Sequence, residues 1–247
     1  MKQGYDINRF FDFLGYYPSN YTPTCPRMRT LSVYIRGDRQ QLEELLDPVP
    51  FVLNDDRFLV TISDFRNQSH FSFFDAAVLI PVRYGDTEGS TYYFEFEDSH
   101  ETVASGREKW GYPKKFAKIS LEDDERSARG DVTLYDETLF RIAVDFDETS
   151  DNAAWRDYKV FPHLQVRAVS EIYGPSFSAF DIISRDTSKD YELIRKRFGK
   201  ASVELGPSIG INGRKLEIVE VLGGEYSVGN FASTRENGRA NVIASLV

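Results

Sequence analysis

The sequence predicts a mainly β protein of the α+β class, in which residues 1–247 form one domain with an antiparallel barrel or sandwich architecture. Aromatic residues are plentiful, with 19 Phe and 14 Tyr, and these residue types favour strands. Apolar runs of strand length alternate with short turn signals. No Pro/Ser-rich linker, internal repeat or low-complexity tract divides the 247 residues. A chain of this length can therefore bury one large core.

Helical signals are few. The aromatic-rich residues 5–17 predict a short amphipathic helix that packs onto the body of the protein. Asp38 is a good N-cap for residues 39–46, RQQLEELL, whose leucines form one stripe, and Asp47-Pro48 ends this second helix. Residues 189–199 fit either a helix or a strand.

Strand signals dominate the remainder of the chain. The segments rich in β-branched and aromatic residues are 58–65, 71–84, 91–97, 131–146, 163–173 and 215–224. GDTEGS at 85–90 predicts a turn, and Asp136-Glu137 predicts the tip of a hairpin. The polar residues 236–242 predict an exposed loop.

The formal net charge of −9 argues against broad binding to nucleic acid or to an anionic membrane, because both need a basic face. An anionic ligand would need a local positive pocket. The single cysteine, Cys25, excludes an internal disulfide. The first residues lack the apolar run of a signal peptide, and no run of 18 apolar residues follows. We therefore expect a cytoplasmic enzyme or binding protein.

Common catalytic and cofactor motifs are missing from the sequence. His70, His100 and His163 show no HxxxH or HxH spacing, so we interpret them as structural or surface residues and expect no metal site. There is no GxSxG motif, and Cys25 has no local nucleophile signature. Gly206, Gly210 and Gly213 match neither the Walker nor the dinucleotide pattern, so we interpret them as turn residues.

The most unusual stretch is GREKWGYPKKFAKI at 106–119, where Lys114 and Lys115 are adjacent in aromatic, Pro-stiffened surroundings. One interpretation is an ordinary solvated pair of lysines. The other is a nucleophilic amine. A lysine with an ordinary pKa of about 10.4 attacks a ketone only when it is deprotonated, and both burial and a second cation lower that pKa. The resulting iminium ion is an electron sink for cleavage of a carbon–carbon bond.

Acetoacetate decarboxylases are the standard example of this arrangement, and residues 106–119 resemble their lysine segment, in which Gly-Arg-Glu leads into aromatic-Pro-Lys-Lys. FFDAAVLIPVRYG at 73–85 resembles the family's acidic residue, small-residue run and Ile-Pro-Val strand. The similarity is clear over residues 71–119, weaker back to Leu31, and limited to strand rhythm beyond 145. The resemblance implies a β-barrel or cone wrapped by further sheet, a few short helices, and assembly into homo-oligomers.

The resemblance also implies roles for individual residues. Lys114 matches the Schiff-base lysine of the family, and Lys115 matches the neighbour that depresses its pKa. Tyr112 falls on a pocket position. Asp75 falls where the family's decarboxylases carry an active-site glutamate, so the carboxylate is retained on a stem that is one methylene shorter.

The family's decarboxylases hold the substrate carboxylate with an arginine near the first strand. In a gapless match, that position is Met28 in this chain. Arg27 and Arg29 flank it, and a shift by one residue would restore an arginine. We therefore expect one of these two side chains to bind the substrate.

The resemblance implies a lyase that uses a Schiff-base lysine to decarboxylate a short β-keto acid through an iminium and an enamine. Its expected partner is a small keto acid, and it needs no cofactor. One alternative is an aldolase-dehydratase that condenses pyruvate with an aldehyde through the same Schiff base. Another is a barrel that binds a small anion without turnover, in which Lys114 is a plain counter-charge.

Overall fold

The computed structural model describes residues 21–247, so the helix predicted over residues 5–17 lies outside the described residues. The helices are α2 (Arg39–Leu46) and α3 (His100–Trp110). The strands of the first half are β1 (Thr24–Gly37), β2 (Val52–Leu53), β3 (Arg57–Asp64), β4 (Phe74–Tyr84), β5 (Thr87–Glu97), β6 (Lys114–Phe116) and β7 (Lys118–Asp123). They are followed by β8 (Ser127–Leu134), β9 (Glu137–Phe146), β10 (His163–Ser170), β11 (Phe177–Arg185), β12 (Glu192–Leu205), β13 (Gly210–Ile211), β14 (Arg214–Lys215), β15 (Ile218–Ala232) and β16 (Ala240–Ser245).

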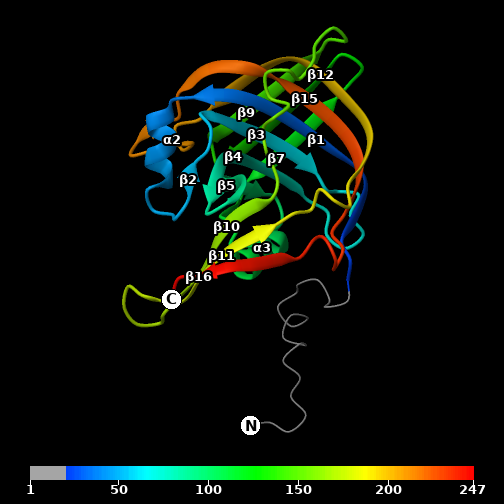
Figure 1. Ribbon diagram of the computed structural model, residues 1–247. Coiled ribbons are helices and arrows are strands. Elements are labelled where there is room, and N and C mark those ends of the chain that lie inside the picture. Colours follow the sequence, from blue (N-terminus) through cyan, green and yellow to red (C-terminus); the bar gives the residue numbers. More distant parts are fainter. Residues whose placement is uncertain (1–20) are drawn as a thin grey trace.

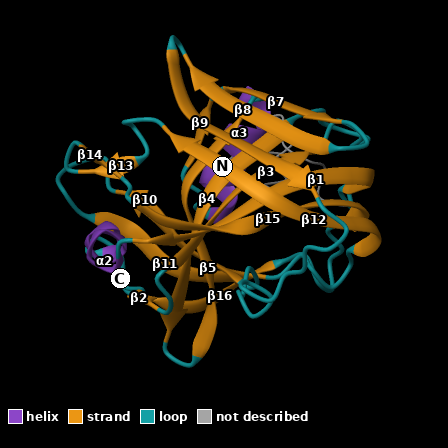
Figure 2. Ribbon diagram, turned by 90° about the horizontal axis from the view of Figure 1, so that it is seen from above, coloured by secondary structure: helices purple, strands orange, loops and turns teal. Residues whose placement is uncertain are grey.

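Fourteen of these strands form one large mixed sheet. Its order is β16-β11-β10-β5-β4-β3-β1-β15-β12-β9-β8-β7, with β2 paired to β4 and β6 paired to β5. Neighbours are antiparallel except that β5 runs parallel to both β6 and β10. Figures 1 and 2 show that the sheet curls strongly, and Figure 2 shows α2 on the same side of the molecule as β13 and β14. The predicted mainly β class is confirmed.

Most predicted elements are present, with some changes at their ends. Asp38 caps α2 by accepting a hydrogen bond of 2.8 Å from the backbone N–H of Gln41. The ambiguous segment 189–199 lies mostly in β12, a strand. The turn predicted over 85–90 is shorter, because Gly85 has φ 57° and β5 already begins at Thr87. The loop predicted over 236–242 ends at Ala240, where β16 begins.

The sheet separates the hydrophobic core from a cavity because successive side chains of a strand point to opposite faces. The core face of β1 carries Leu31, Val33 and Ile35. Its other face carries Met28, Thr30, Ser32 and Tyr34, which line the cavity. On β3, Phe58, Val60 and Ile62 face the core, whereas Leu59, Thr61 and Ser63 line the cavity. Each strand thus contributes to stability with one face and to the site with the other.

The core is built from aliphatic and aromatic side chains of the central strands. Its largest fully buried members include Phe58, Phe140, Leu31, Ile62 and Tyr226. Neither α2 nor α3, the helices of residues 21–247, is long and apolar enough to cross a membrane.

Candidate active site

A cavity of about 600 Å³ lies on the face of the sheet opposite the core. This size falls within the range of small-molecule sites in proteins. Its aromatic wall consists of Tyr34, Phe65, Phe73, Tyr92, Trp110, Tyr112, Trp155, Tyr158, Phe161, Tyr191 and Phe231. Apolar walls exclude water and strengthen electrostatic interactions between the few polar groups inside.

Lys114 and three carboxylates form a buried cluster at the wall of this cavity. Asp75 on β4 pairs in register with Glu97 on β5, and Glu95 on β5 pairs with Lys114 on β6. The Lys114 Nζ lies 3.3 Å from Asp75 Oδ2 and 2.9 Å from Glu95 Oε1, and it also contacts Glu97 Oε1. All four residues are buried, with at most 8% of the residue surface exposed. Three neighbouring strands therefore deliver one amine and three acids to one point.

Burial and mutual charge shift the protonation of this cluster. Burial alone would lower the pKa of Lys114, but the charges of Glu95, Glu97 and Asp75 outweigh it and raise that pKa. Burial raises the pKa of Glu97 to about 7 and that of Glu95 well above its usual range, although the Lys114 ammonium opposes both shifts. The predicted lowering of the Lys114 pKa is therefore wrong for this site, because three acids surround the amine.

The surroundings of two carboxylate oxygens favour a proton bound to the acids of this cluster. The Oε2 atoms of Glu95 and Glu97 are buried and have no hydrogen-bond partner among the described residues. A buried carboxylate oxygen without a donor is unfavourable when it is charged. With its own ammonium and three ionised acids, the cluster would carry a net charge of −2. A proton shared among the acids reduces that charge.

Helix α3 provides room for the lysine stem. Gly106 lies on its buried face, and a Cβ at that position would overlap Cδ and Cε of Lys114. Arg107 donates a hydrogen bond of 3.1 Å to the backbone oxygen of Lys114. Gly111 ends the helix in the left-handed region at φ 73°, which turns the chain back toward β6. Gly106 and Arg107 thus position Lys114. This role explains why Gly106 stands eight residues before the lysine in the sequence.

A second set of polar side chains lines the same cavity. His163 on β10 and Arg185 on β11 line the cavity together with Tyr112. The Tyr112 hydroxyl and His163 Nδ1 are 3.0 Å apart. Burial lowers the pKa of His163 well below its usual range, and the charges of Arg185 and Lys114 add to this effect. The imidazole is therefore neutral near pH 7.

The model of the acetoacetate decarboxylase family matches residues 14–236. The chain belongs to the acetoacetate decarboxylase family. The match extends across nearly the whole chain, well beyond the lysine segment on which the resemblance first rested.

Relatives within the family are distant. An acetoacetate decarboxylase of Acidiphilium cryptum (strain JF-5) is 35% identical over 88 residues, which cover 35% of this chain and 36% of that protein. An acetoacetate decarboxylase of Burkholderia cenocepacia is 25% identical over 212 residues and is matched over 80% of both chains. The more identical match thus spans only about a third of its relative's length.

Several solved structures of enzymes share the fold. The acetoacetate decarboxylase of Legionella pneumophila superposes with a TM-score of 0.77 at 18% identity, over 92% of this chain and 88% of that one. An acetoacetate decarboxylase-like enzyme from Sphingomonas wittichii RW1 gives 0.73 at 20% identity, over 91% and 93%. The enduracididine biosynthesis enzyme MppR, complexed with pyruvate, gives 0.65 at 14% identity, over 90% of each chain.

The structure brings three of the residues predicted from the family resemblance to one place. Asp75, Tyr112 and Lys114 all line the cavity. Lys114 Nζ lies 5.4 Å from the centroid of the Tyr112 ring, over its face. The three residues therefore share one cavity.

The Lys115 side chain does not line this cavity. It follows Lys114 on β6, where adjacent side chains face opposite sides, and it pairs in register with the core residue Phe96. Its side chain is exposed and borders a separate cavity of about 370 Å³. The groups that shift the pKa of Lys114 are the three acids. The expectation that Lys115 acts on its neighbour is therefore corrected by strand geometry.

Arg27 and Arg29 do not line the cavity either, whereas Met28 does. Arg29 occupies the other face of β1, where it forms ion pairs of 2.5 Å with both Asp64 and Asp123. Arg27 is exposed at a bulge with φ 53°. The expectation that one of them faces the pocket is corrected by the period-two alternation of β1, which turns position 28 inward.

Sequence reasoning missed Glu95, Glu97, His163 and Arg185 as site residues. The two acids alternate with aromatics in TYYFEFE, and this pattern places both on one face of a strand. That signal was available. His163 and Arg185 gave no local signal, because the pairing of β10 with β5 and β11 brings them to the cavity from distant parts of the chain.

The position of Lys115 leads to a test that needs no substrate. We expect the Lys115→Gln variant to leave the pKa of Lys114 unchanged within about 0.3 units, because the removed charge lies on the opposite, solvated face. Trace labelling of amines with acetic anhydride over a pH series, read by mass spectrometry, gives the pKa of each lysine. A clear rise in the pKa of Lys114 in this variant would show that the two amines are coupled.

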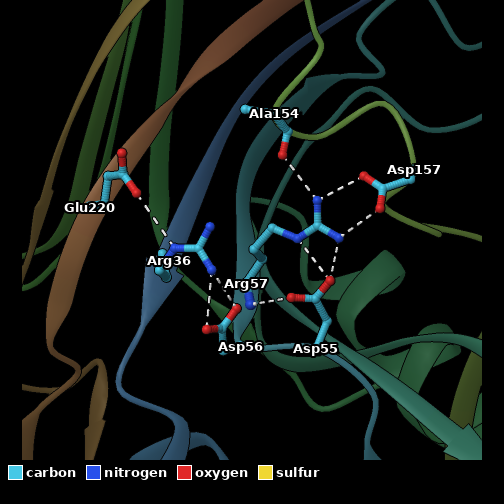
Figure 3. A network of polar contacts seen from close by, with 7 residues as sticks. All are labelled: Arg36, Asp55, Asp56, Arg57, Ala154, Asp157 and Glu220. Carbon is cyan, nitrogen blue, oxygen red and sulfur yellow. Dashed lines mark hydrogen bonds and ion pairs between the residues drawn. The ribbon is translucent and has the colours of Figure 1, made fainter.

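The loop between β9 and β10 covers part of the cavity, and an arginine on β3 helps to hold it in place (Figure 3). Arg57 on β3 donates hydrogen bonds of 3.0 Å to the Ala154 oxygen and 2.8 Å to Asp157 Oδ1. It also pairs with Asp55 next to it. The loop contributes Trp155 to the cavity wall, so Arg57 fixes an aromatic part of the site from outside.

We expect Arg57→Ala to lower the free energy of unfolding by about 1–2 kcal/mol, because several hydrogen bonds of a largely buried guanidinium are lost. We also expect faster proteolysis within residues 147–162. Urea unfolding and limited proteolysis measure the two effects. Arg129→Ala is the matched control, since Arg129 and Asp145 form an exposed pair worth at most about 0.5 kcal/mol. Equal effects of the two substitutions would contradict the anchoring role.

Proposed function

We propose that this protein is a lyase that decarboxylates a short β-keto acid through a Schiff base on Lys114. The observation that carries the proposal is a buried amine, surrounded by three acids, on the wall of a cavity in a member of the acetoacetate decarboxylase family. Buried amines able to exchange a proton with a neighbouring group are the usual nucleophiles toward ketones.

The first step is activation of the amine. Lys114 transfers a proton to Glu97, whose carboxylate contacts Nζ and whose pKa is about 7. In a buried site the resulting neutral pair is less costly than two separated charges. The free amine then attacks the ketone carbon to give a carbinolamine. The Glu97 carboxylic acid returns its proton to the carbinolamine oxygen, which leaves as water, and the iminium ion forms.

The second step breaks the carbon–carbon bond. The electron pair of the bond to the carboxylate moves into the iminium, so carbon dioxide leaves and a neutral enamine remains. Asp75 or Glu95, each within 3.3 Å of Nζ, supplies the proton that the enamine carbon takes up. Water then adds to the new iminium, and hydrolysis releases a ketone and restores the amine.

An aldolase-dehydratase is the second candidate, and the breadth of the cavity favours it. A volume of about 600 Å³ exceeds what acetoacetate alone requires and would hold an enamine of pyruvate together with an aldehyde. The fold neighbour MppR was solved with pyruvate and with the condensation product of pyruvate and imidazole 4-carboxaldehyde. Both reactions begin with the same iminium and differ in the bond that is made or broken.

Borohydride trapping tests the proposal and separates the candidates. Hydride reduces the iminium carbon, which leaves a stable secondary amine on the lysine. With acetoacetate, a decarboxylase is trapped as an N-isopropyl adduct at Lys114, because carbon dioxide has already left. An enzyme that forms the Schiff base without decarboxylation keeps the carboxylate in the adduct. Peptide mass spectrometry distinguishes these two masses, and pyruvate with an aldehyde tests the condensation.

Three outcomes decide among the functions. An N-isopropyl adduct together with release of carbon dioxide supports the decarboxylase. An adduct that keeps its carboxylate, with a condensation product from pyruvate and an aldehyde, supports the aldolase-dehydratase. No adduct with acetoacetate, pyruvate or longer keto acids would reject the nucleophile, and binding of these acids without an adduct would indicate a small-anion-binding barrel.

We also propose that the protein assembles into a homo-oligomer. Exposed apolar side chains gather at the end of the sheet formed by β16 and the loop between β10 and β11, which lie together in Figure 1. They include Ile172 and Tyr173, 87% and 88% exposed, and Val242, 59% exposed. Exposed apolar patches of this kind mark protein interfaces. Light scattering measures the mass, and a monomer at micromolar concentration would reject the assembly.

A further inference from the structure

We propose that Arg185 and His163, joined through Tyr112, form the subsite that binds the substrate carboxylate in this protein. The group would take the place of the arginine that the family's decarboxylases carry near the first strand, where this chain has Met28 at the cavity. The proposal rests on the Schiff-base function proposed above, because it assigns the carboxylate of the same substrate.

The guanidinium of Arg185 is held in a fixed position. Its Nε donates a hydrogen bond of 2.9 Å to the Gly238 oxygen, and Nη2 donates one of 3.1 Å to Ser233 Oγ. Its central carbon lies 4.2 Å from the centroid of the Trp110 ring, over its face. These contacts leave N–H groups at Nη1 and Nη2 for further acceptors. A planar fork fixed in this way suits two-point binding of a carboxylate.

No carboxylate of residues 21–247 lies within 4.0 Å of the Arg185 guanidinium, although the chain is acidic overall. Other cations of the cavity wall either have an acidic partner or are exposed to solvent. Lys196 pairs with Glu225 at 3.0 Å, and Arg156 is exposed on the loop between β9 and β10. A partly buried guanidinium without an acidic partner is favourable when a ligand supplies the negative charge.

The proposed subsite assigns one tautomer to His163. Arg185 can only donate, and it interacts with the Tyr112 hydroxyl, whose pKa is raised by burial while Arg185 opposes that shift. In the proposed subsite the Tyr112 oxygen accepts from Arg185 and donates its own proton to His163 Nδ1, which lies 3.0 Å away. A neutral imidazole that accepts at Nδ1 carries its proton at Nε2.

His163 Nε2 is the free end of this chain of hydrogen bonds. The atom is buried and has no hydrogen-bond partner among the described residues, while the ring itself is fixed by stacking on Phe161 at 4.4 Å. A buried donor without an acceptor costs about 1–3 kcal/mol. An oxygen of a bound carboxylate would remove that cost. Arg185 and His163 thus offer a charge and a directed N–H to the same ligand.

The position of the subsite relative to Lys114 fits a keto acid. The Lys114 Nζ lies 5.4 Å from the centroid of the Tyr112 ring, and the hydroxyl of the same ring contacts His163. Tyr112 therefore borders both the amine and the subsite on one cavity wall. A keto acid bound covalently to Lys114 would extend its carboxylate along this wall toward the subsite. The ketone would face the acids and Lys114, and the carboxylate would face Arg185.

Trapping with two ligands of the same shape tests the subsite. Acetoacetate and its neutral methyl ester both present a ketone to Lys114, but only acetoacetate presents a carboxylate. In Arg185→Gln we expect the acetoacetate concentration that gives half-maximal borohydride trapping to rise about 10–100-fold, as for the loss of a charge-assisted hydrogen bond. For the methyl ester we expect a change of less than about twofold. Arg83→Gln, an equal change of charge outside the cavity wall, should alter neither value.

His163 variants test the directed N–H. His163→Gln keeps an N–H donor near the position of Nε2 and should retain most of the discrimination between acid and ester, whereas His163→Phe keeps a ring without a donor and should lose it. Equal responses of acid and ester to Arg185→Gln would overturn the proposed subsite while leaving the Schiff-base function intact. If neither ligand is trapped by the wild-type protein, the proposed function itself fails.

Discussion

Turnover of a keto acid should fall on the order of 10⁴-fold or more when Lys114 is replaced by Arg, because removing a covalent nucleophile leaves only binding and electrostatic effects. Arginine keeps the positive charge among the three acids but cannot become a neutral amine near pH 7. The variant should therefore fold, although the larger side chain is crowded by the helix backbone at Gly106. Steady-state kinetics and circular dichroism measure activity and folding separately.

Chemical rescue excludes a purely structural explanation of that loss. Lys114→Cys treated with 2-bromoethylamine regains an amine in which sulfur replaces one methylene, and we expect a partial return of activity and of borohydride trapping. The reagent could also modify Cys25, although that residue is buried. Lys114→Ala treated with 2-bromoethylamine is the control for modification of Cys25. Appreciable activity in untreated Lys114→Arg, or no rescue of a well-folded Lys114→Cys, would remove Lys114 from the role of nucleophile.

The Glu97→Gln substitution should have the next largest effect. Burial raises the pKa of Glu97 from 4.5 to about 7. Below that pH the acid is protonated and cannot accept the proton of Lys114, so the wild-type rate should rise as pH increases through about 7. Glutamine cannot accept the proton at any pH. We expect kcat to fall about 100-fold, the usual contribution of a positioned general base, and the rising limb near pH 7 to disappear or move.

The same shift predicts an effect on stability. Because the folded state holds a proton on Glu97 that the unfolded state releases, the unfolded state binds fewer protons between pH 4.5 and about 7. Stability should therefore fall as pH rises through this window. In Glu97→Gln this part of the pH dependence should be absent. Glu122→Gln, at an exposed position on β7, is the matched control. Identical pH profiles of wild type and Glu97→Gln would contradict the assignment of the bound proton to Glu97.

The sequence predicted most strands because their alternation of apolar side chains is a local property. It did not predict α3, since HETVASGREKW has no apolar stripe and buries the small residues Thr102, Ser105 and Gly106. That helix is instead stabilised by its Ser99 cap, by its left-handed end at Gly111, and by packing over the lysine. Its fit against Lys114 is a tertiary property that no helical periodicity records.

Adjacency along the chain was misleading at two places for the same physical reason. Lys114 and Lys115 are neighbours in sequence and lie on opposite faces of β6. Met28 and Arg29 are separated in the same way on β1. In a strand, the residue two positions away is the neighbour in space. Had that spacing been applied to TYYFEFE, Glu95 and Glu97 would have been expected beside each other.

The two-faced sheet separates the residues that set stability from those that set chemical selectivity. Replacing Leu31 or Val33 would leave a cavity in the core and cost about 2–5 kcal/mol. On the other face of the same strand, Met28, Thr30 and Ser32 border the cavity and lie outside the main core cluster. Replacing them changes the lining of the cavity rather than that cluster. A protein built in this way can accumulate changes in what it binds while its scaffold remains intact. Such independence permits one architecture to persist between proteins with very different sequences, such as this chain and MppR, which share 14% identity.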